Sequence, residues 1–171
     1  MRFEKISLHQ FIEEDMQEYI AYEDIKLPRR ATKDSAGYDF FSVIDFTLNP
    51  GENILLPTGI KVCLNTFLPP DTEADYGYYL LMVPRSSLGF KYRLQLDNTV
   101  GVIDADYYNN PKNEGHIKIK ITNDSKDKIL KIKQGEAIAQ GIISIYYKTE
   151  DDDATSERTG GCGSTNKSTS N

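Results

Sequence analysis

Hydrophobic and polar residues alternate along most of this chain in short runs. The clearest case is residues 116–122, where three isoleucines interleave with two lysines. Alternation with a period of two is typical of a half-buried strand, and the Pro, Gly, Asn and Asp residues between the runs mark turns. Strands are predicted at residues 36–42, 45–48, 54–56, 59–64, 78–83, 116–122, 129–132 and 138–147. Many short strands separated by turns predict an all-β fold, as a sandwich, a barrel or a jelly roll.

The N-terminus carries a different pattern, because its apolar residues recur at the spacing of a helix. Ser7 and Gln10 fit a capping box, which places the start of the helix at Ser7. The residues expected on one apolar stripe are Leu8, Phe11, Ile12, Met16, Tyr19 and Ile20. We expect a single helix that docks on the core or on a neighbouring subunit. Residues 1–6, which precede it, either pair as a strand or fray.

The 171 residues are enough for one domain with a sizeable core. After residue 147 the sequence is acidic and then rich in Gly, Ser and Thr, with too little apolar content to fold by itself. We therefore expect an N-terminal helical extension over residues 1–23, a core domain over residues 24–147 and a flexible tail over residues 148–171.

Composition and charge argue against several classes of protein. The formal net charge of −6 argues against broad binding to nucleic acids or anionic membranes. The two cysteines, Cys63 and Cys162, and the two histidines have spacings that fit neither a disulfide framework nor a zinc site. No apolar run has the length of a membrane span, and the N-terminus lacks a signal-peptide pattern, so we expect a cytoplasmic protein.

The run from residue 98 to residue 108 combines strand formers with acidic and aromatic residues. Its valines and isoleucine favour a strand, whereas Asp104 and Asp106 are unusual in one. On an extended backbone these two aspartates share a face, since alternate residues point the same way. The two carboxylates either satisfy the backbone of a turn or form part of a site.

Five runs of the sequence, taken in order, resemble the five sequence motifs of trimeric dUTP pyrophosphatases (dUTPases). They are residues 36–42, 84–89, 101–107, 135–140 and 158–165. Five motifs in one order are far more specific than a single motif. The resemblance extends from Asp24 to Thr165 and implies the jelly-roll-like dUTPase (β-clip) fold. It also implies a homotrimer with shared active sites, set in a bacterial or phage-infected bacterial cell.

The reaction implied by the resemblance is hydrolysis of dUTP to dUMP and diphosphate, by in-line attack of water on the α-phosphate. Asp104 is then the general base that orients this water, and Gln140 holds the phosphates or the water. The Tyr107 ring lies under the deoxyribose, where a 2′-hydroxyl does not fit, and the Asn98 amide reads the uracil edge. The other substrate-binding residues of this stretch are Gly101 and Ile103.

Phosphate binding is implied for the second motif. Ser86 opens a phosphate loop, followed by Ser87 where the family usually has glycine, and Arg85 either binds phosphate or ties subunits together. Asp39 of the first motif belongs either to the polar network near the metal and the phosphates or to a buried structural hydrogen bond. The implied metal is Mg²⁺, held by the triphosphate and water rather than directly by protein side chains.

The fifth motif implies a flap that closes over the ligand. Arginine suits bidentate binding of the terminal phosphate, which assigns this role to Arg158. The other substrate-binding residues of the flap are Gly161, Cys162, Gly163 and Ser164. Cys162 departs from the family pattern, which has a phenylalanine that covers the base, because cysteine cannot stack. Residues 108–115 are a second departure, a longer polar loop that we expect to project from the surface.

Two alternatives fit parts of the same sequence. A dCTP deaminase of this fold has a phosphate loop similar to residues 84–89, but it needs a glutamate on the strand after the third motif, and residues 117–121 carry none. A nucleotide-gated regulatory protein would bind a partner through the acidic N-terminal helix or residues 108–115. Otherwise the expected partners are dUTP and other copies of the chain, without nucleic acid or membrane.

Overall fold

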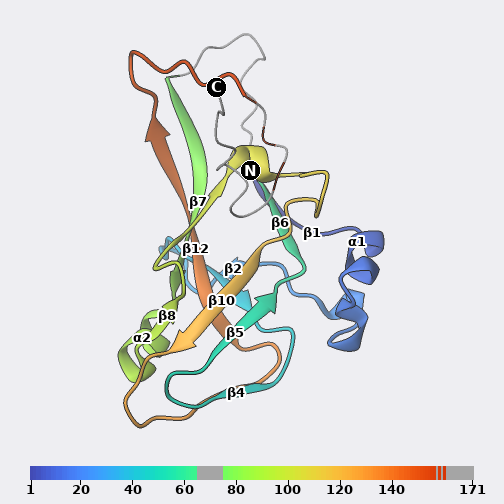
Figure 1. The fold of residues 1–171 in the computed structure, drawn as a ribbon, viewed down its shortest axis with the longest axis vertical. Coiled ribbons are helices and arrows are strands. Elements are labelled where there is room, and N and C mark those ends of the chain that lie inside the picture. The colour runs from blue at the N-terminus through green and yellow to red at the C-terminus, as the bar shows by residue number, and fades with distance from the viewer. Residues whose placement is uncertain (65–74, 157, 159, 161–171) are drawn as a thin grey trace, which may run out of the picture.

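Two long antiparallel strands form the centre of the molecule (Figure 1). The computed structural model describes residues 1–64, 75–156, 158 and 160. β7 (Tyr76–Pro84) and β12 (Ala137–Tyr147) pair with each other over nine residues, in register from Tyr76 opposite Tyr147. They occupy the middle of a five-stranded sheet with the order β2-β3-β12-β7-β9.

The other strands form three smaller sheets, which pair β1 with β6, β4 with β11, and β10 with both β5 and β8. The bounds of these strands and of those flanking the central pair are β1 Arg2–Lys5, β2 Arg29–Arg30, β3 Tyr38–Phe41, β4 Phe46–Leu48, β5 Asn53–Pro57, β6 Ile60–Cys63, β8 Leu94–Leu96, β9 Gly101–Asp104, β10 Lys118–Asn123 and β11 Leu130–Ile132. Each strand predicted from alternation is present with shifted ends, which confirms the all-β prediction. β2 and β8 lie outside the predicted strands.

Alternate residues of these strands build the core. In β10 and just before it, Ile117, Ile119 and Ile121 are buried, whereas Lys118 and Lys120 between them are exposed. The largest fully buried side chains include Phe40, Leu56, Leu80, Leu94, Leu130 and Ile138. Burial of this apolar surface is the main force that holds the strands together.

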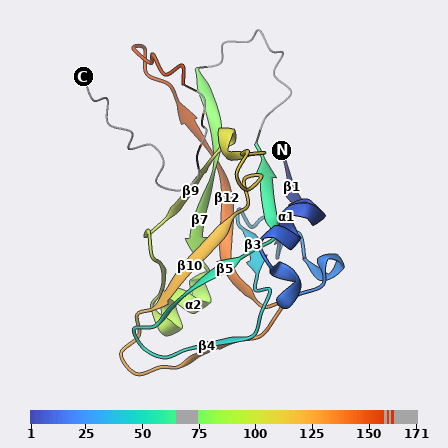
Figure 2. The same cartoon turned by 45° about the vertical axis from the view of Figure 1, so that its right-hand side comes forward.

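Helical segments are short and lie around the sheets. α1 (Leu8–Glu13) lies beside β6, and α2 (Ser86–Tyr92) lies on the opposite side (Figures 1 and 2). The 3-10 turns are η1 Met16–Glu18, η2 Tyr22–Asp24 and η3 Ala105–Tyr107. In the part of the chain that the structure describes, no helix has the length and apolar character needed to cross a membrane.

The prediction of one long N-terminal helix with a single apolar stripe is wrong. α1 ends after six residues, and Asp15 takes a left-handed conformation with φ 54° before η1 begins. A left-handed residue cannot continue a right-handed helix, so the faces before and after it are not aligned. Phe11 and Met16 are buried in the core, whereas Leu8 and Ile12 are 54% and 53% exposed.

The start of α1 agrees in part with the predicted capping box. The Ser7 hydroxyl accepts from the Gln10 N–H at 3.1 Å, which confirms Ser7 as the cap. The reciprocal half of the box is wrong, because the Gln10 amide bonds to Glu14 at 3.0 Å. The Ser7 N–H instead donates to the Glu114 carboxylate at 3.0 Å.

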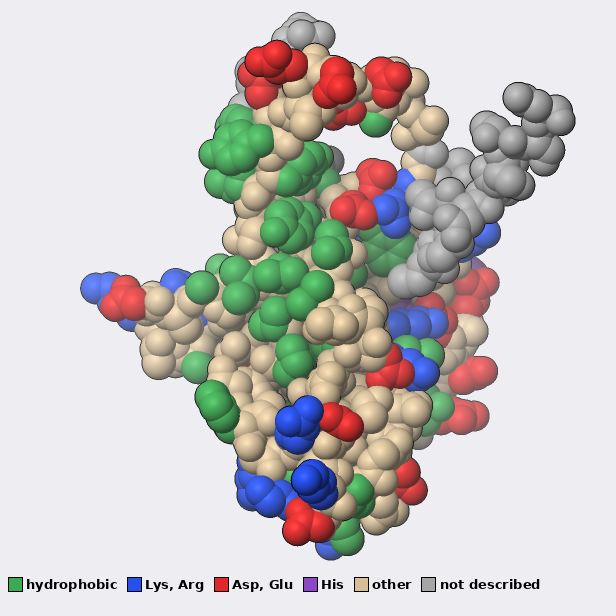
Figure 3. All heavy atoms as spheres, turned by 60° about the vertical axis from the view of Figure 1, so that its left-hand side comes forward, with side chains coloured by type: hydrophobic (Ala, Val, Ile, Leu, Met, Phe, Trp, Pro, Cys, Tyr) green, Lys and Arg blue, Asp and Glu red, His purple; other side chains and the backbone are tan. Residues whose placement is uncertain are grey.

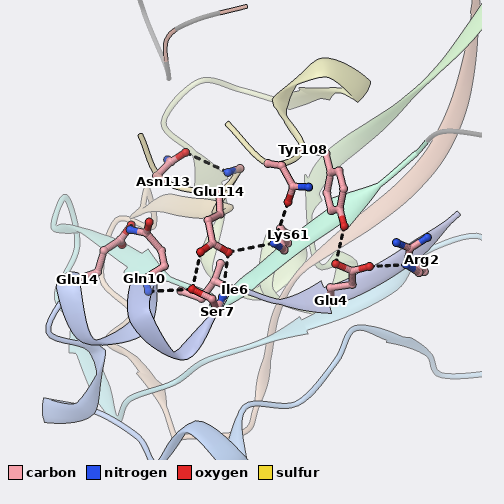
Figure 4. Close-up of polar contacts among 12 residues, drawn as sticks. Arg2, Glu4, Ile6, Ser7, Gln10, Glu14, Lys61, Tyr108, Asn113 and Glu114 are labelled. Carbon is pink, nitrogen blue, oxygen red and sulfur yellow. Dashed lines mark hydrogen bonds and ion pairs between the residues drawn. The ribbon is translucent and has the colours of Figure 1, made fainter. Parts of the chain in front are cut away.

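The prediction that residues 108–115 project from the surface is also wrong. They fold back against the N-terminal segment, as Figure 4 shows. The Tyr108 hydroxyl donates to Glu4 at 2.7 Å, and the Glu114 carboxylate accepts from Ser7. These polar residues have partners about a hundred positions away in the chain, which no local pattern reveals.

Candidate active site

The central predicted run spans the turn between β8 and β9, β9 itself and η3. Its turn is closed by the Thr99 N–H, which donates to the Leu96 carbonyl at 2.8 Å, and Thr99 is left-handed with φ 66°. Asn98, the predicted reader of the base, lies exposed in this turn. Gly101 lies opposite Met82 of β7, where a Cβ would stand 3.0 Å from the Met82 Cβ. The glycine therefore lets β9 pack closely on β7.

Two carboxylates at the end of β9 share one arginine. Asp104 contacts the Arg158 guanidinium through Nη2, and the Asp106 carboxylate in η3 lies 2.9 Å from Nε. The two aspartates thus face the same guanidinium, although a 3-10 turn rather than a continuing strand brings them together. The Asp104 side chain is 46% exposed, so water reaches it.

Tyr107 lies next to these carboxylates and is only 7% exposed. The Arg158 guanidinium lies 5.9 Å from the centroid of its ring, within the range of a cation–π contact. The tyrosine hydroxyl accepts from Asn113 Nδ2 at 2.7 Å and donates to the His116 carbonyl at 3.3 Å. Asp104, Tyr107 and Arg158 therefore form one group in the folded chain.

Asp39, Arg85 and Gln140 form a second group, where β3 and β12 pair and β7 ends. The Asp39 carboxylate is 5% exposed. It accepts from Arg85 Nε and Nη2, both at 3.3 Å, and from Gln140 Nε2 at 3.0 Å. These hydrogen bonds satisfy the buried charge. Ser86 and Ser87 follow in the first turn of α2, a short helix in place of the predicted loop, and both are exposed.

The two groups lie apart in a single chain. Asp104 is opposite Tyr79 of β7, whereas Gln140 is opposite Val83. These positions differ by four residues of strand, which is roughly 13 Å along β7. The described residues of one chain therefore form two partial sites rather than one complete pocket.

Of the remaining predicted site residues, the structure describes one and leaves four outside its described part. Ile103 is half-buried and packs against the core beside Asp104. The flap residues Gly161, Cys162, Gly163 and Ser164 lie outside the described residues.

Sequence reasoning missed three residues that contact the site: Asn110, Asn113 and His116. Asn110 is buried, and its Nδ2 donates to the Gly160 carbonyl at 3.2 Å, so that the 108–115 loop also holds the tail. The available signal in the sequence was the presence of Asn110 and Asn113 in a polar insertion. That signal does not identify their partners, because the loop contacts depend on the tertiary fold.

His116 connects the first group to the N-terminal segment. Its Nε2 accepts from the Gly59 N–H at 2.8 Å, and its Nδ1 lies 2.9 Å from the Glu14 carboxylate. Lys118 contacts the same carboxylate at 2.8 Å. Burial acts to raise the pKa of Glu14, but the hydrogen bonds from His116 and Lys118 together lower it to about 2. At neutral pH the Glu14 carboxylate is therefore ionised, and it contacts both His116 and Lys118.

Comparison with known sequences identifies the family. The dUTPase family model matches residues 23–166. The deoxyuridine 5′-triphosphate nucleotidohydrolase of Lactococcus lactis subsp. lactis is 40% identical over 143 residues, which cover 82% of this chain and 88% of the relative. The protein of the same name from Nautilia profundicola is 35% identical over 146 residues, which cover 82% and 91%.

Solved structures agree with the sequence comparison. The crystal structure of dUTPase from Streptococcus mutans aligns with a TM-score of 0.63 at 33% identity, over 89% of this chain and 99% of that one. The dUTPase from phage phi11 of S. aureus shares the fold with a TM-score of 0.57 at 23% identity, over 83% and 96%. These matches confirm the jelly-roll-like dUTPase fold and do not favour the deaminase or regulatory alternatives. This chain belongs to the dUTPase family.

Proposed function

We propose that the protein hydrolyses dUTP to dUMP and diphosphate through in-line attack of water on the α-phosphate. The observation that carries the proposal is the water-accessible Asp104 beside the buried Tyr107, in a chain that the dUTPase family model matches over residues 23–166. The reaction limits uracil in DNA and supplies dUMP for dTMP synthesis. The bacterial cytoplasm is the proposed setting.

Asp104 orients and deprotonates the attacking water. A carboxylate within hydrogen-bond reach of a water molecule can accept its proton. In the free protein Arg158 contacts this carboxylate, and a triphosphate would compete for the guanidinium because arginine binds phosphate in a bidentate way. Binding of the substrate would thus move Arg158 to the terminal phosphate and leave Asp104 free to act.

Selectivity comes from the β8–β9 turn, β9 and η3. The Tyr107 ring lies under the deoxyribose and excludes a 2′-hydroxyl, and the Asn98 amide pairs with the uracil edge. Gly101 and Ile103 shape the backbone of this part of the pocket, where Gly101 allows close packing on β7.

The second group and the start of α2 hold the phosphates, through Arg85, Ser86, Ser87 and Gln140. Among the described residues, no three acidic, histidine or cysteine side chains gather to hold a metal ion. The oxygens of Asp39 already accept from Arg85 and Gln140, so we propose that Mg²⁺ is held through the phosphates and water. Mg²⁺ supplies positive charge that stabilises the phosphoryl oxygens. A structural Mg(II) ion is described for the dUTPase of phage phi11.

We propose a homotrimer with shared sites. The separation of the two groups supports it, because each complete site would then take one group from each of two subunits. The exposed apolar face of the central sheet supports this assembly (Figure 3). Val102 and Tyr146 are 53% and 46% exposed there, beside Tyr79 and Leu81 of β7. A contact between copies of the chain would bury this apolar surface.

The experiment that tests the function measures diphosphate release from dUTP, dCTP, dTTP and UTP. We expect turnover of dUTP alone. Asp104→Asn should lower kcat by about 10²- to 10⁴-fold, which is the usual contribution of a general base. Asp106→Asn, which changes the neighbouring carboxylate, should keep most of the activity. Full activity of Asp104→Asn would contradict the assignment of the base, and equal turnover of UTP would contradict the role of Tyr107.

A further inference from the structure

The hydroxyl of Tyr107 is held at its far end by residues outside the five motifs. Asn113 Nδ2 donates to it at 2.7 Å, and it donates to the His116 carbonyl at 3.3 Å. The ring is therefore fixed at both its Cβ end and its hydroxyl end. A ring with no partner for its hydroxyl would be free to tilt about its own side-chain torsions.

The segment that carries Asn113 returns tightly to the backbone of Tyr107. Gly115 has φ +79°, and a Cβ at this position would lie 2.2 Å from the Tyr107 carbonyl oxygen. The Asn113 carboxamide oxygen accepts from the Gly115 N–H at 3.1 Å and closes the turn. One amide therefore closes the turn through its oxygen and holds the tyrosine through its nitrogen.

The same segment is anchored to the N-terminal part of the chain, as Figure 4 shows. Glu114 accepts from the Ser7 N–H and from Lys61 Nζ, each at 3.0 Å. Tyr108 donates to Glu4 at 2.7 Å. Contacts on both sides of Asn113 thus limit its movement relative to the core.

We propose that Asn113 is a positioning residue that sets the discrimination of the site between deoxyribonucleotides and ribonucleotides. The inference rests on the proposed function, in which the Tyr107 ring lies under the deoxyribose. Exclusion of a 2′-hydroxyl is steric, so it is only as strong as the resistance of the ring to displacement. Asn113 adds to the resistance given by burial of the ring and by the His116 carbonyl, because it holds the phenol oxygen.

The test compares kcat/KM for dUTP and for UTP in the full-length protein. Asn113→Ala should reduce the ratio of these values roughly fivefold, the effect of one hydrogen bond of ordinary strength. The reduction should come from improved turnover of UTP relative to dUTP. A general loss of structure would lower both activities and leave their ratio unchanged. Lys112→Ala, an exposed neighbour in the same segment, is the matched control and should keep the wild-type ratio.

A double-mutant cycle separates the hydrogen bond from the turn. Tyr107→Phe removes the hydroxyl, leaves Asn113 and its turn intact, and should lower the ratio by itself. Adding Asn113→Ala to Tyr107→Phe should then have little further effect on the ratio, because the group that Asn113 holds is already absent. Equal effects of Asn113→Ala in both backgrounds would overturn the inference.

The two proposals fail in different ways. A wild-type protein that does not hydrolyse dUTP overturns the proposed function and the inference with it. A wild-type protein that hydrolyses dUTP selectively, with the same selectivity in Asn113→Ala and Tyr107→Phe, overturns the inference alone.

Discussion

At the scale of single residues, Glu14 shows how a partly buried charge is made stable. Its carboxylate is shared by His116 and Lys118, and together they bring its pKa to about 2 against the opposing effect of burial. The Gly59 N–H donates to Nε2 of His116, which leaves the ring proton on Nδ1, directed at Glu14. His116 therefore faces the carboxylate through Nδ1.

This arrangement predicts a pH-dependent contribution to stability. Because the folded-state pKa of Glu14 is lower than its ordinary value of 4.5, its contribution is present above about pH 4.5 and lost as the pH falls towards 2. Glu14→Gln should lower the free energy of unfolding at pH 7 by about 2 kcal/mol, and the difference from wild type should shrink in acid. Urea unfolding at several pH values measures this. Glu18→Gln, at an exposed site, is the control, and a difference independent of pH would contradict the ion pair.

At the scale of elements, the N-terminal segment is one strand and one short helix, each fixed by contacts of its own. β1 pairs with β6 from Arg2 opposite Cys63 to Lys5 opposite Ile60. α1 places one face on the core, where Phe11 meets the Tyr22 ring edge-to-face at 5.4 Å between centroids. The left-handed residue after α1 breaks the stripe that a continuous helix would have.

Substitutions in α1 distinguish this arrangement from a continuous apolar stripe. Phe11→Ala should lower the free energy of unfolding by about 3–5 kcal/mol, as for other buried aromatic residues. Leu8→Ala, at a half-exposed position, should change it by less than about 0.5 kcal/mol. Chemical denaturation of the two variants measures both values. Similar large losses would indicate that Leu8 is buried as well.

At the scale of the whole molecule, the proposed trimer predicts that catalysis depends on assembly. The first group lies at the end of β9, and the second lies where β3 and β12 pair, with β7 between them. In the proposed trimer, a site takes the first group from one subunit and the second from its neighbour.

Mixed assemblies test this dependence. Asp104→Asn and Gln140→Ala change different groups, so each should have little activity alone. When the two variants are coexpressed, the mixture should recover about a quarter of the wild-type rate. With random assembly in a ring, one site in four takes its intact first group from one variant and its intact second group from the other. Asp104→Asn with Tyr107→Ala changes the same group twice and should show no recovery. Recovery in neither mixture would indicate that each subunit carries a complete site.

The sequence by itself determined most of the strands and the order of the chemical motifs. Strands follow from alternation because side chains on a pleated strand face opposite sides, and Ile117, Ile119 and Ile121 obey that rule. The motifs are readable because their residues lie close together in the sequence. Asp104, Tyr107 and Arg158, which belong to two of these motifs, lie together in the fold.

Only the tertiary structure decided which distant groups meet. Three features depend on contacts that no local pattern shows. They are the end of the helix at Asp15, the packing of residues 108–115 on the N-terminal segment, and the hydrogen bond from Asn113 to Tyr107. The separation of the two groups along β7 depends on strand order and register, which pairing across the sheet sets. Such contacts are selected by the shape and polarity of the folded surroundings, whereas hydrophobic periodicity specifies only which side of each element faces the core.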